Sequence, residues 1–330
     1  MKEDKDVQKT LADVILHKVD AEKGEGPELA KAHGVRGYPT FIMTNAKVEP
    51  MDRWIGYTKD MLADNLAGAL ADMTTIDEKK ARFAKTPTTK DAVKLAGFAG
   101  SMGEYGEAID LYKQASTMDK GNHYAEEIFE STYSGLRRET DGFDFARTQS
   151  AAKHALEHAS SDNAILNVCN MMAMASKKAE NETAMVSYIK TAIEKTNDTK
   201  DEKALQTRSK MMPSYALHVE KNEKKAVELK KANMAEGWMN DAGQINNYAW
   251  WAFENGVDTK NALKMAMKGV ELAPPGKEKA MILDTAAELC NSLEDCARSV
   301  ELTQMAMAED PESEFYKEQL VRFQEALAKQ

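Results

Sequence analysis

The feature that most constrains this fold is a repeated pair of helical patterns. From about Asp91 onward, amphipathic stretches typical of helices follow one another with short polar breaks, and no alternating strand pattern interrupts them. In the clearest copy, Gly103 marks a turn, and the small residues Ala108 and Ala115 follow it. Small residues at this spacing let two antiparallel helices approach closely. A period of about 34 residues therefore indicates helix hairpins that stack and bury one another's apolar faces.

The same pattern returns near the C-terminus. Two further copies keep a small, small, proline spacing, at Ala262, Gly269 and Pro274 and at Ser299, Ala306 and Pro311. Between the outer copies, helical periodicity alone predicts three poorer pairs, at 124–138 with 143–159, 164–176 with 183–195, and 204–219 with 224–236. We expect about six hairpins over residues 91–311, closed by a capping helix within 312–330.

This pattern resembles the tetratricopeptide repeat. On that fingerprint Gly103 and Tyr105 lie at the turn, Ala108 and Ala115 at the close-packing positions, and Leu95 on the first helix. The resemblance implies a mainly α fold, a tetratricopeptide-like α-solenoid. It also implies a protein-protein interaction scaffold, whose partner is another protein or a peptide, without catalysis.

The repeat register also predicts a groove that binds the partner. It turns Ala249 and Trp250 toward the packing side and the following residues toward the groove: Gln244, Asn247, Trp251 and Glu254, with Asp284, Glu288 and Asn291 on the neighbouring wall. Amide, aromatic and acidic groups in a concavity are suited to an extended peptide backbone and favour basic side chains. In the alternative interpretation, Trp251 is wedged between helices and has only a packing role.

Residues 1–74 show a different pattern, in which short strand-like and helical stretches alternate. Strand-like stretches occur at 15–19, 38–44 and 53–57, and helical stretches at 27–33 and 59–71. The polar stretch that follows ends in Thr86-Pro87-Thr88-Thr89, so we expect a linker over residues 75–90.

The segment from Val19 to Tyr57 resembles the second half of a thioredoxin domain. The resemblance implies a small, incomplete α/β domain with a cis peptide before Pro39 and a groove formed by Tyr38, Pro39 and Gly56. The family's dithiol motif and central strand do not occur in the sequence, so the sheet is expected to lack its middle unless its strands re-pair or a partner supplies it.

The missing half keeps an alternative function open. In that interpretation the chain is a thiol-disulfide oxidoreductase whose Cys-x-x-Cys half lies upstream of Met1. Such an extension would also carry any export signal, so a cytoplasmic location is expected by default and a periplasmic or secreted one if the polypeptide starts further upstream.

The sequence predicts neither a catalytic residue, nor a cofactor, nor a metal site. The three cysteines, Cys169, Cys290 and Cys296, have no Cys-x-x-Cys spacing, and we expect them to be structural thiols. His154-Ala155-Leu156-Glu157-His158 spells H-x-x-E-H, which on a helix could hold zinc. We favour a polar helix face, because repeat stacking brings no obvious third ligand. The methionines around Cys169 are interpreted as core residues rather than copper ligands.

Charge and hydropathy narrow the range of partners. The 330 residues carry 44 basic and 54 acidic side chains, a net charge of −10, which argues against a dominant role on nucleic acid or anionic lipid. No apolar run approaches the roughly 20 residues that a membrane-spanning helix needs. We therefore expect neither a nucleic-acid partner nor insertion into a membrane.

Overall fold

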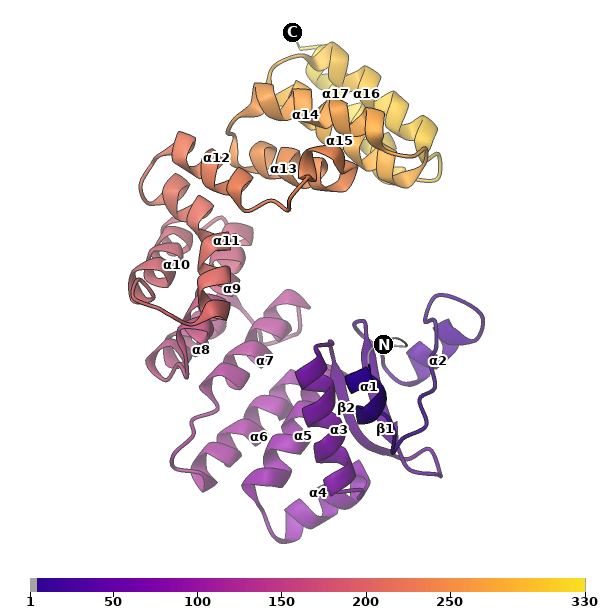
Figure 1. Cartoon of the computed structure of the whole chain (residues 1–330), viewed down its shortest axis with the longest axis vertical. Helices are drawn as coiled ribbons and strands as arrows, with labels where there is room; N and C mark the ends of the chain where they lie inside the picture. The colour runs from indigo at the N-terminus through magenta and orange to yellow at the C-terminus, as the bar shows by residue number, and fades with distance from the viewer. Residues whose placement is uncertain (1–4, 330) are drawn as a thin grey trace. The chain divides into compact units, whose positions relative to one another are not determined.

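The computed structural model describes residues 5–329 and is mainly helical (Figure 1). It divides into two compact units, a first up to Met185 and a second from Val186 onward. The predicted fold class, a mainly α helical-repeat solenoid that follows a small α/β segment, is confirmed. Among the described residues there is no helix of the length and apolar character that crossing a membrane requires.

The first unit begins with the α/β segment and continues as helices. Its elements are α1 (Lys5–Thr10), α2 (Gly26–Ala32), β1 (Thr40–Thr44), β2 (Pro50–Ile55), α3 (Lys59–Ala71), α4 (Ile76–Lys85), α5 (Thr89–Met102), α6 (Tyr105–Met118), α7 (Ala125–Arg137), α8 (Phe145–Glu157) and α9 (Asp162–Lys178). The division between the units falls within α10 (Glu182–Lys195).

The second unit is helical throughout. After α10 it contains α11 (Glu202–His218), α12 (Glu223–Ala232), the short 3-10 helix η1 (Trp238–Asn240), α13 (Ala242–Asn255), α14 (Thr259–Leu272), α15 (Lys277–Ser292), α16 (Cys296–Glu309) and α17 (Glu314–Leu327). The helices that periodicity predicts are therefore present, the three poorer pairs and the capping helix included.

The first hairpin shows why the small residues recur. Gly103 ends α5 in the left-handed conformation, at φ 84°, which suits a residue without a Cβ atom. Ala108 and Ala115 are fully buried on α6. A Cβ atom placed on Gly100 of α5 would lie 3.8 Å from the Cβ atom of Ala108, so the two helices are in van der Waals contact there.

Hydrogen bonds join residues about one period apart, both between repeats and within one hairpin. The backbone N–H of Ser160, before α9, donates to Glu126 of α7 at 2.8 Å, across a separation of 34 residues and from one repeat to the next. The N–H of Gly276, at the start of α15, donates to Glu309, at the end of α16, at 2.8 Å and so closes the open end of one hairpin.

The core of the second unit is built from helices α13 to α17. Ile245 of α13, Ile282 of α15 and Leu302 of α16 are fully buried in one cluster. A Cβ atom on Gly269 of α14 would come within 3.2 Å of Ile282 and 3.3 Å of Ile245. The predicted small residue at position 269 is therefore required by close packing.

The α/β segment agrees with the sequence prediction only in part. Strands β1 and β2 pair antiparallel, with Phe41 opposite Trp54, and α2 and α3 occupy the predicted positions. The strand predicted at 15–19 is wrong. These residues have no regular structure, and Ile15 is fully exposed, because the two-stranded sheet offers them no paired neighbour. A complete thioredoxin-like sheet is not formed by the described residues.

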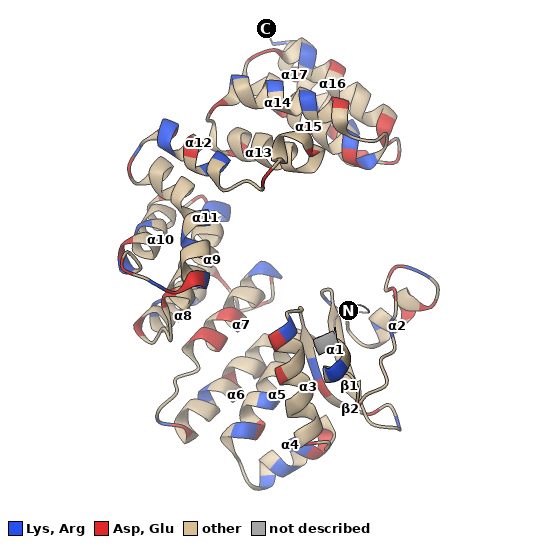
Figure 2. Ribbon diagram, viewed as in Figure 1, with Lys and Arg blue, Asp and Glu red and all other residues tan. Residues whose placement is uncertain are grey.

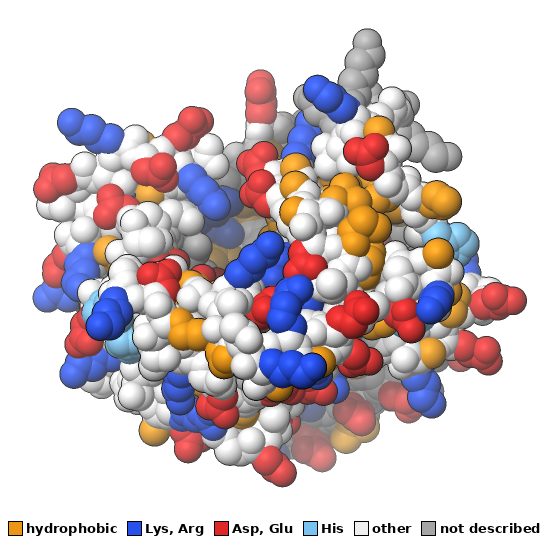
Figure 3. Space-filling view, turned by 90° about the horizontal axis from the view of Figure 1, so that it is seen from below, with side chains coloured by type: hydrophobic (Ala, Val, Ile, Leu, Met, Phe, Trp, Pro, Cys, Tyr) orange, Lys and Arg blue, Asp and Glu red, His pale blue; other side chains and the backbone are white. Residues whose placement is uncertain are grey.

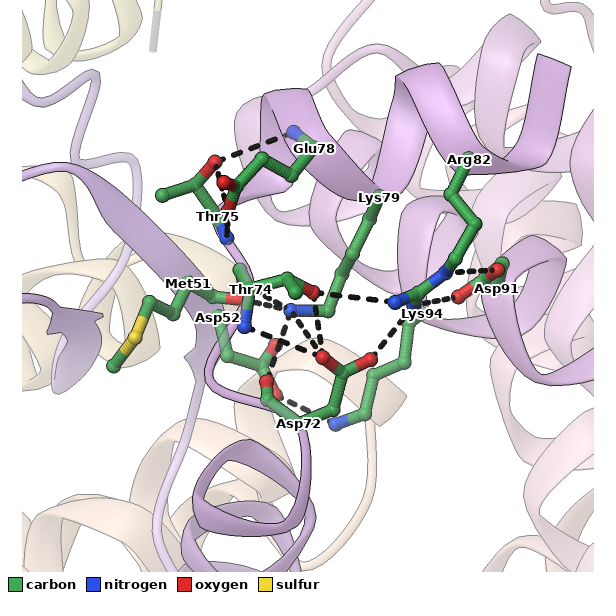
Figure 4. Close-up of polar contacts among 10 residues, drawn as sticks. All are labelled: Met51, Asp52, Asp72, Thr74, Thr75, Glu78, Lys79, Arg82, Asp91 and Lys94. Carbon is green, nitrogen blue, oxygen red and sulfur yellow. Dashed lines mark hydrogen bonds and ion pairs between the residues drawn. The ribbon is translucent and has the colours of Figure 1, made fainter. Parts of the chain in front are cut away.

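The polar stretch predicted as a linker contains helix α4. Thr75 and Glu78 form a capping box that starts this helix. One turn on, Lys79 is 2% exposed, and its ammonium group donates to the carbonyl oxygens of Met51 at 3.2 Å and Asp72 at 3.1 Å and to that of Thr74 (Figure 4). Main-chain carbonyls thus hold this buried charge.

Ion pairs continue this network from the sheet to the first hairpin (Figure 4). Arg82 of α4 donates to Asp72 at 2.7 Å and to Asp91 of α5 at 2.9 Å. Lys94 of α5 pairs with Asp52 of β2 at 2.6 Å. The hydrogen bonds from Arg82 lower the pKa values of both Asp72 and Asp91. The α/β segment and the first hairpin therefore pack together, although the proposed domain boundary itself stays a prediction.

The close contact between α5 and α6 predicts the effect of overpacking. Replacing Ala108 by Phe should cost roughly 1–3 kcal/mol of unfolding free energy, because a fully buried position has no room for a ring. Thermal or urea unfolding measures this cost. Gly97→Ala in the same hairpin is the control, since a Cβ atom there meets no atom within 4 Å. If both variants unfold like the unmodified chain, the repeat register is wrong.

Candidate functional site

The predicted groove residues of α13 differ in exposure. Asn247 and Glu254 are exposed, and Gln244 and Trp251 are half-buried. The spacing of three, four and three residues places all four on one side of the helix. Asp241 caps the start of this helix by accepting from the N–H of Gln244 at 2.8 Å, which fixes where the first turn begins.

Trp251 contributes to packing as well as to this surface. Its ring lies 6.1 Å from that of Tyr248, which is fully buried, and it packs against the core of the second unit. The ammonium group of Lys230 lies 5.7 Å from the centre of the Trp251 ring, and burial lowers the pKa of this lysine. Much of the Trp251 ring therefore packs among helices, as the alternative interpretation expects. Trp250, predicted to face the packing side, is 37% exposed.

The predicted second wall of the groove is covered. Asp284 and Glu288 of α15 are each only 8% exposed, because the capping helix α17 lies over them. The side-chain amide of Gln319 donates to Asp284 and, at 3.0 Å, to Glu288, and Arg322 pairs with Glu288. The expectation that both carboxylates line an open groove is wrong. Asn291 is half-buried near the end of α15, next to the Cys296 thiol at 3.8 Å.

Burial makes Asp284 a weaker acid than an exposed aspartate. Loss of water raises its pKa to about 6, and the neighbouring Glu288 adds to the rise, while the bond from Gln319 opposes it. The amide oxygen of Gln319 is buried and accepts no hydrogen bond. At neutral pH the ionised carboxylate of Asp284 is therefore unfavourable in this buried position. The contact between α15 and the capping helix α17 is most stable when Asp284 is protonated.

The residues assigned to a thioredoxin-like groove do lie together. The Tyr38–Pro39 peptide is cis, and the N–H of Gly56 donates to the carbonyl oxygen of Pro39 at 2.8 Å. The Tyr38 side chain is 64% exposed. Nothing in this arrangement supplies a thiol, because the cysteines lie elsewhere, in α9, α15 and α16.

All three cysteines are buried and form no disulfide among the described residues. Burial raises the pKa of Cys290 to about 11, and the charge of Asp295 adds to this rise. A thiol must ionise to attack a disulfide, so such a group is a poor nucleophile at neutral pH. The structure gives no support to thiol-disulfide exchange by the described residues.

A cluster of three histidines is the site that the sequence prediction missed. His154 lies in the last turn of α8 and His158 directly follows it, one turn further on, as the H-x-x-E-H spacing predicts, and His123 from the loop before α7 joins them. Their closest nitrogen ligand atoms all lie within 4.8 Å of one another. His123 precedes the first helix of this hairpin and the other two end the second, so the pairing of α7 with α8 is the signal that could have brought them together.

The surface carries charges of both signs. Lysine and arginine side chains are interspersed with aspartate and glutamate on the helices and on the face that Figure 3 shows (Figures 2 and 3).

Comparisons with known proteins point to similar helical-repeat structures. The sequence matches no known family profile and no curated protein. It is similar to a tetratricopeptide repeat protein from Parabacteroides merdae, with 14% identity, 76% of this chain and 91% of that chain covered, and a TM-score of 0.44. It is also similar to YrrB, a TPR protein with an unusual peptide-binding site, with 13% identity, 74% of this chain and 98% of that chain covered, and a TM-score of 0.40. Its similarity to yeast Tom70 is 15% identity, with 98% of this chain and 63% of that chain covered and a TM-score of 0.43. These likenesses do not tell what this chain binds.

The raised pKa of Asp284 predicts a pH-dependent stability. The folded chain binds this proton more tightly than the unfolded chain, whose carboxyl has a pKa of 3.8, so stability falls as pH rises from about 4 to about 6. Asp284→Asn removes the buried charge and offers an N–H group to the free oxygen of Gln319. We expect it to raise the unfolding free energy by roughly 2 kcal/mol at pH 7 and to have little effect at pH 4.

Urea unfolding at several pH values measures this difference. Glu318→Gln, at an exposed position of α17, is the control and should leave the pH profile unchanged. A loss of stability in Asp284→Asn at pH 7 would contradict the assignment, since it would mean that the ionised carboxylate stabilises the cap.

The buried thiols predict slow alkylation. At pH 8 a pKa near 11 leaves Cys290 roughly a hundredfold less thiolate than its usual pKa of 9.0 would. Iodoacetamide should therefore label Cys290 slowly in the folded chain and quickly in guanidinium chloride, as mass spectrometry of digests can measure. For the same reason the chain should not speed the reduction of insulin by dithiothreitol. Fast labelling of Cys290 in the folded chain would overturn both expectations.

Proposed function

We propose that this chain is a protein-interaction scaffold that holds an extended peptide against one face of α13. The observation that carries the proposal is the side of this helix formed by Gln244, Asn247, Trp251 and Glu254, where polar side chains and an aromatic ring remain at the surface while the opposite side builds the core. The Asn247 side chain is exposed and has no hydrogen-bond partner among residues 5–329.

The chemistry of this face suits a peptide main chain. A side-chain amide both donates and accepts, so Asn247 and Gln244 are able to bond the N–H and C=O groups of an extended segment. The half-buried ring of Trp251 offers apolar area for a side chain of the partner.

Selectivity for basic peptides is not part of this proposal. The two carboxylates expected to provide it, Asp284 and Glu288, are bonded by Gln319 and Arg322 of the capping helix. Lys230 beside Trp251 brings a positive charge to the remaining surface. We therefore assign recognition to backbone bonding and apolar contact rather than to opposite charge.

We assign no chemistry to the N-terminal α/β segment, a redox-inactive and truncated thioredoxin-like module in this proposal. Tyr38, Pro39 and Gly56 would serve as a further contact surface. The exposed ring of Tyr38 supports this role, and the two-stranded sheet without a thiol fits the absence of exchange chemistry.

The test is a selection of random peptides displayed on phage, with the full chain as bait. A synthetic copy of the selected peptide is then titrated by fluorescence anisotropy. Asn247→Ala should weaken its binding about fivefold, near 1 kcal/mol, because one or two interface hydrogen bonds are lost. The melting temperature should stay nearly the same, since an exposed amide contributes little to folding.

Asn197→Ala is the matched control, an exposed asparagine outside α13. It should bind the peptide like the unmodified chain. If Gln244→Ala combined with Asn247→Ala also leaves binding unchanged, the face of α13 is not the binding surface and the proposal fails.

A further inference from the structure

Three histidine side chains converge at the open end of the α7–α8 hairpin in the first unit. His154 lies in the last turn of α8, His158 directly follows that helix, and His123 lies just before α7. The rings of His123 and His158 are 3.8 Å apart between centres, and those of His154 and His158 are 4.7 Å apart. Two separate segments of chain thus deliver imidazoles to one point.

The backbone under each histidine is held by packing. Next to His123, the buried ring of Tyr124 stacks on Tyr112 with 6.0 Å between ring centres. On α8, Ala152 and Ala155 are fully buried, which fixes the face that carries His154 and His158. The cluster therefore does not depend on a flexible loop to bring its members together.

A hydrogen bond sets the distance between the two histidine-bearing segments. Glu126, in the first turn of α7, accepts from the N–H of Ser160 at 2.8 Å. This bond joins a residue three positions after His123 to a residue two positions after His158. It holds the ends of both histidine-bearing segments side by side.

The imidazoles have no competing partner. Among the described residues no side-chain hydrogen bond or ion pair engages any of them, and their rings lie against one another. Burial lowers the pKa of His154, and the two neighbouring histidines add to this effect, while Glu157 opposes it. Three imidazoles this close together form a suitable set of ligands for a metal ion.

We propose that His123, His154 and His158 bind one divalent transition-metal ion, with Zn²⁺ as the expected occupant and a water molecule at the fourth position. Bonds of about 2.0–2.1 Å to a tetrahedral Zn²⁺ place ligand nitrogens about 3.3 Å apart. The observed limit of 4.8 Å leaves a short distance that side-chain rotation closes. The positive ion also lies at the carboxyl end of α8, where the helix dipole favours a cation.

The ligand set decides the class of metal. Imidazole nitrogens suit Zn²⁺, Ni²⁺ and Cu²⁺, whereas Ca²⁺ and Mg²⁺ require several oxygen ligands. No cysteine belongs to the cluster, so it is not suited to a metal that needs thiolates. With one ligand from the loop before α7 and two from the end of α8, the bound ion would join the start and the end of one helix hairpin.

Isothermal titration of the full, chelator-treated chain with zinc chloride tests the proposal. We expect one strong equivalent, and a rise of the melting temperature when Zn²⁺ is present, because the ion binds the folded state. His123→Ala and His158→Ala should each weaken the binding by roughly tenfold or more, since two imidazoles alone hold Zn²⁺ weakly. Both residues are exposed, so both variants are expected to fold.

The double variant His17→Ala with His33→Ala is the matched control, because it removes two exposed histidines outside the cluster and should keep the strong equivalent. Titration with Co²⁺ adds a spectroscopic readout, since tetrahedral coordination produces strong visible absorption that the His123 variant should lose. The proposal is overturned if the chain binds no Zn²⁺ at micromolar concentration. It is also overturned if His123→Ala binds as well as the unmodified chain, which would leave only the pair on α8.

Discussion

The structure depends on the close approach of neighbouring helices, which only small side chains permit. Ala108, Ala262 and Ala306 are fully buried on the second helices of their hairpins, and no larger side chain fits at such a contact. Once the helices pack at this distance, each hairpin is placed on its neighbour in the same way. Residues about one period apart then become neighbours, as the hydrogen bond between Glu126 and Ser160 of successive repeats shows.

Local patterns predict what is local in this fold. Periodicity predicts each α-helix from α5 to α17, and turn glycines or small residues support the outer hairpins, because these signals act within one hairpin. The strand predicted at 15–19 does not form, since a strand also needs a neighbour, and the neighbour is not specified by its own residues. In the polar stretch at 75–90, the capping box of Thr75 and Glu78 starts α4, which ends before Pro87.

The site residues were harder to predict because they depend on contacts between repeats. The register correctly placed Asn247 at the surface, since exposure along one helix follows its own periodicity. It did not reveal that Gln319 would cover Asp284, because this contact spans 35 residues and involves the capping helix. The same limit explains why H-x-x-E-H looked incomplete. Its third histidine comes from the start of the partner helix α7, so a search along α8 alone does not find it.

Two kinds of surface result from this construction. A helix face keeps its exposed residues in a row, as on α13, and such a row suits an extended partner. The ends of the helices instead bring together residues from both ends of a hairpin, and there a few side chains converge on a point, as His123 does on His154 and His158. Convergence suits a small, charged ligand better than a peptide. Binding of a peptide and binding of a metal ion therefore require different parts of the same repeat, and a change in one loop residue can alter the second without disturbing the first.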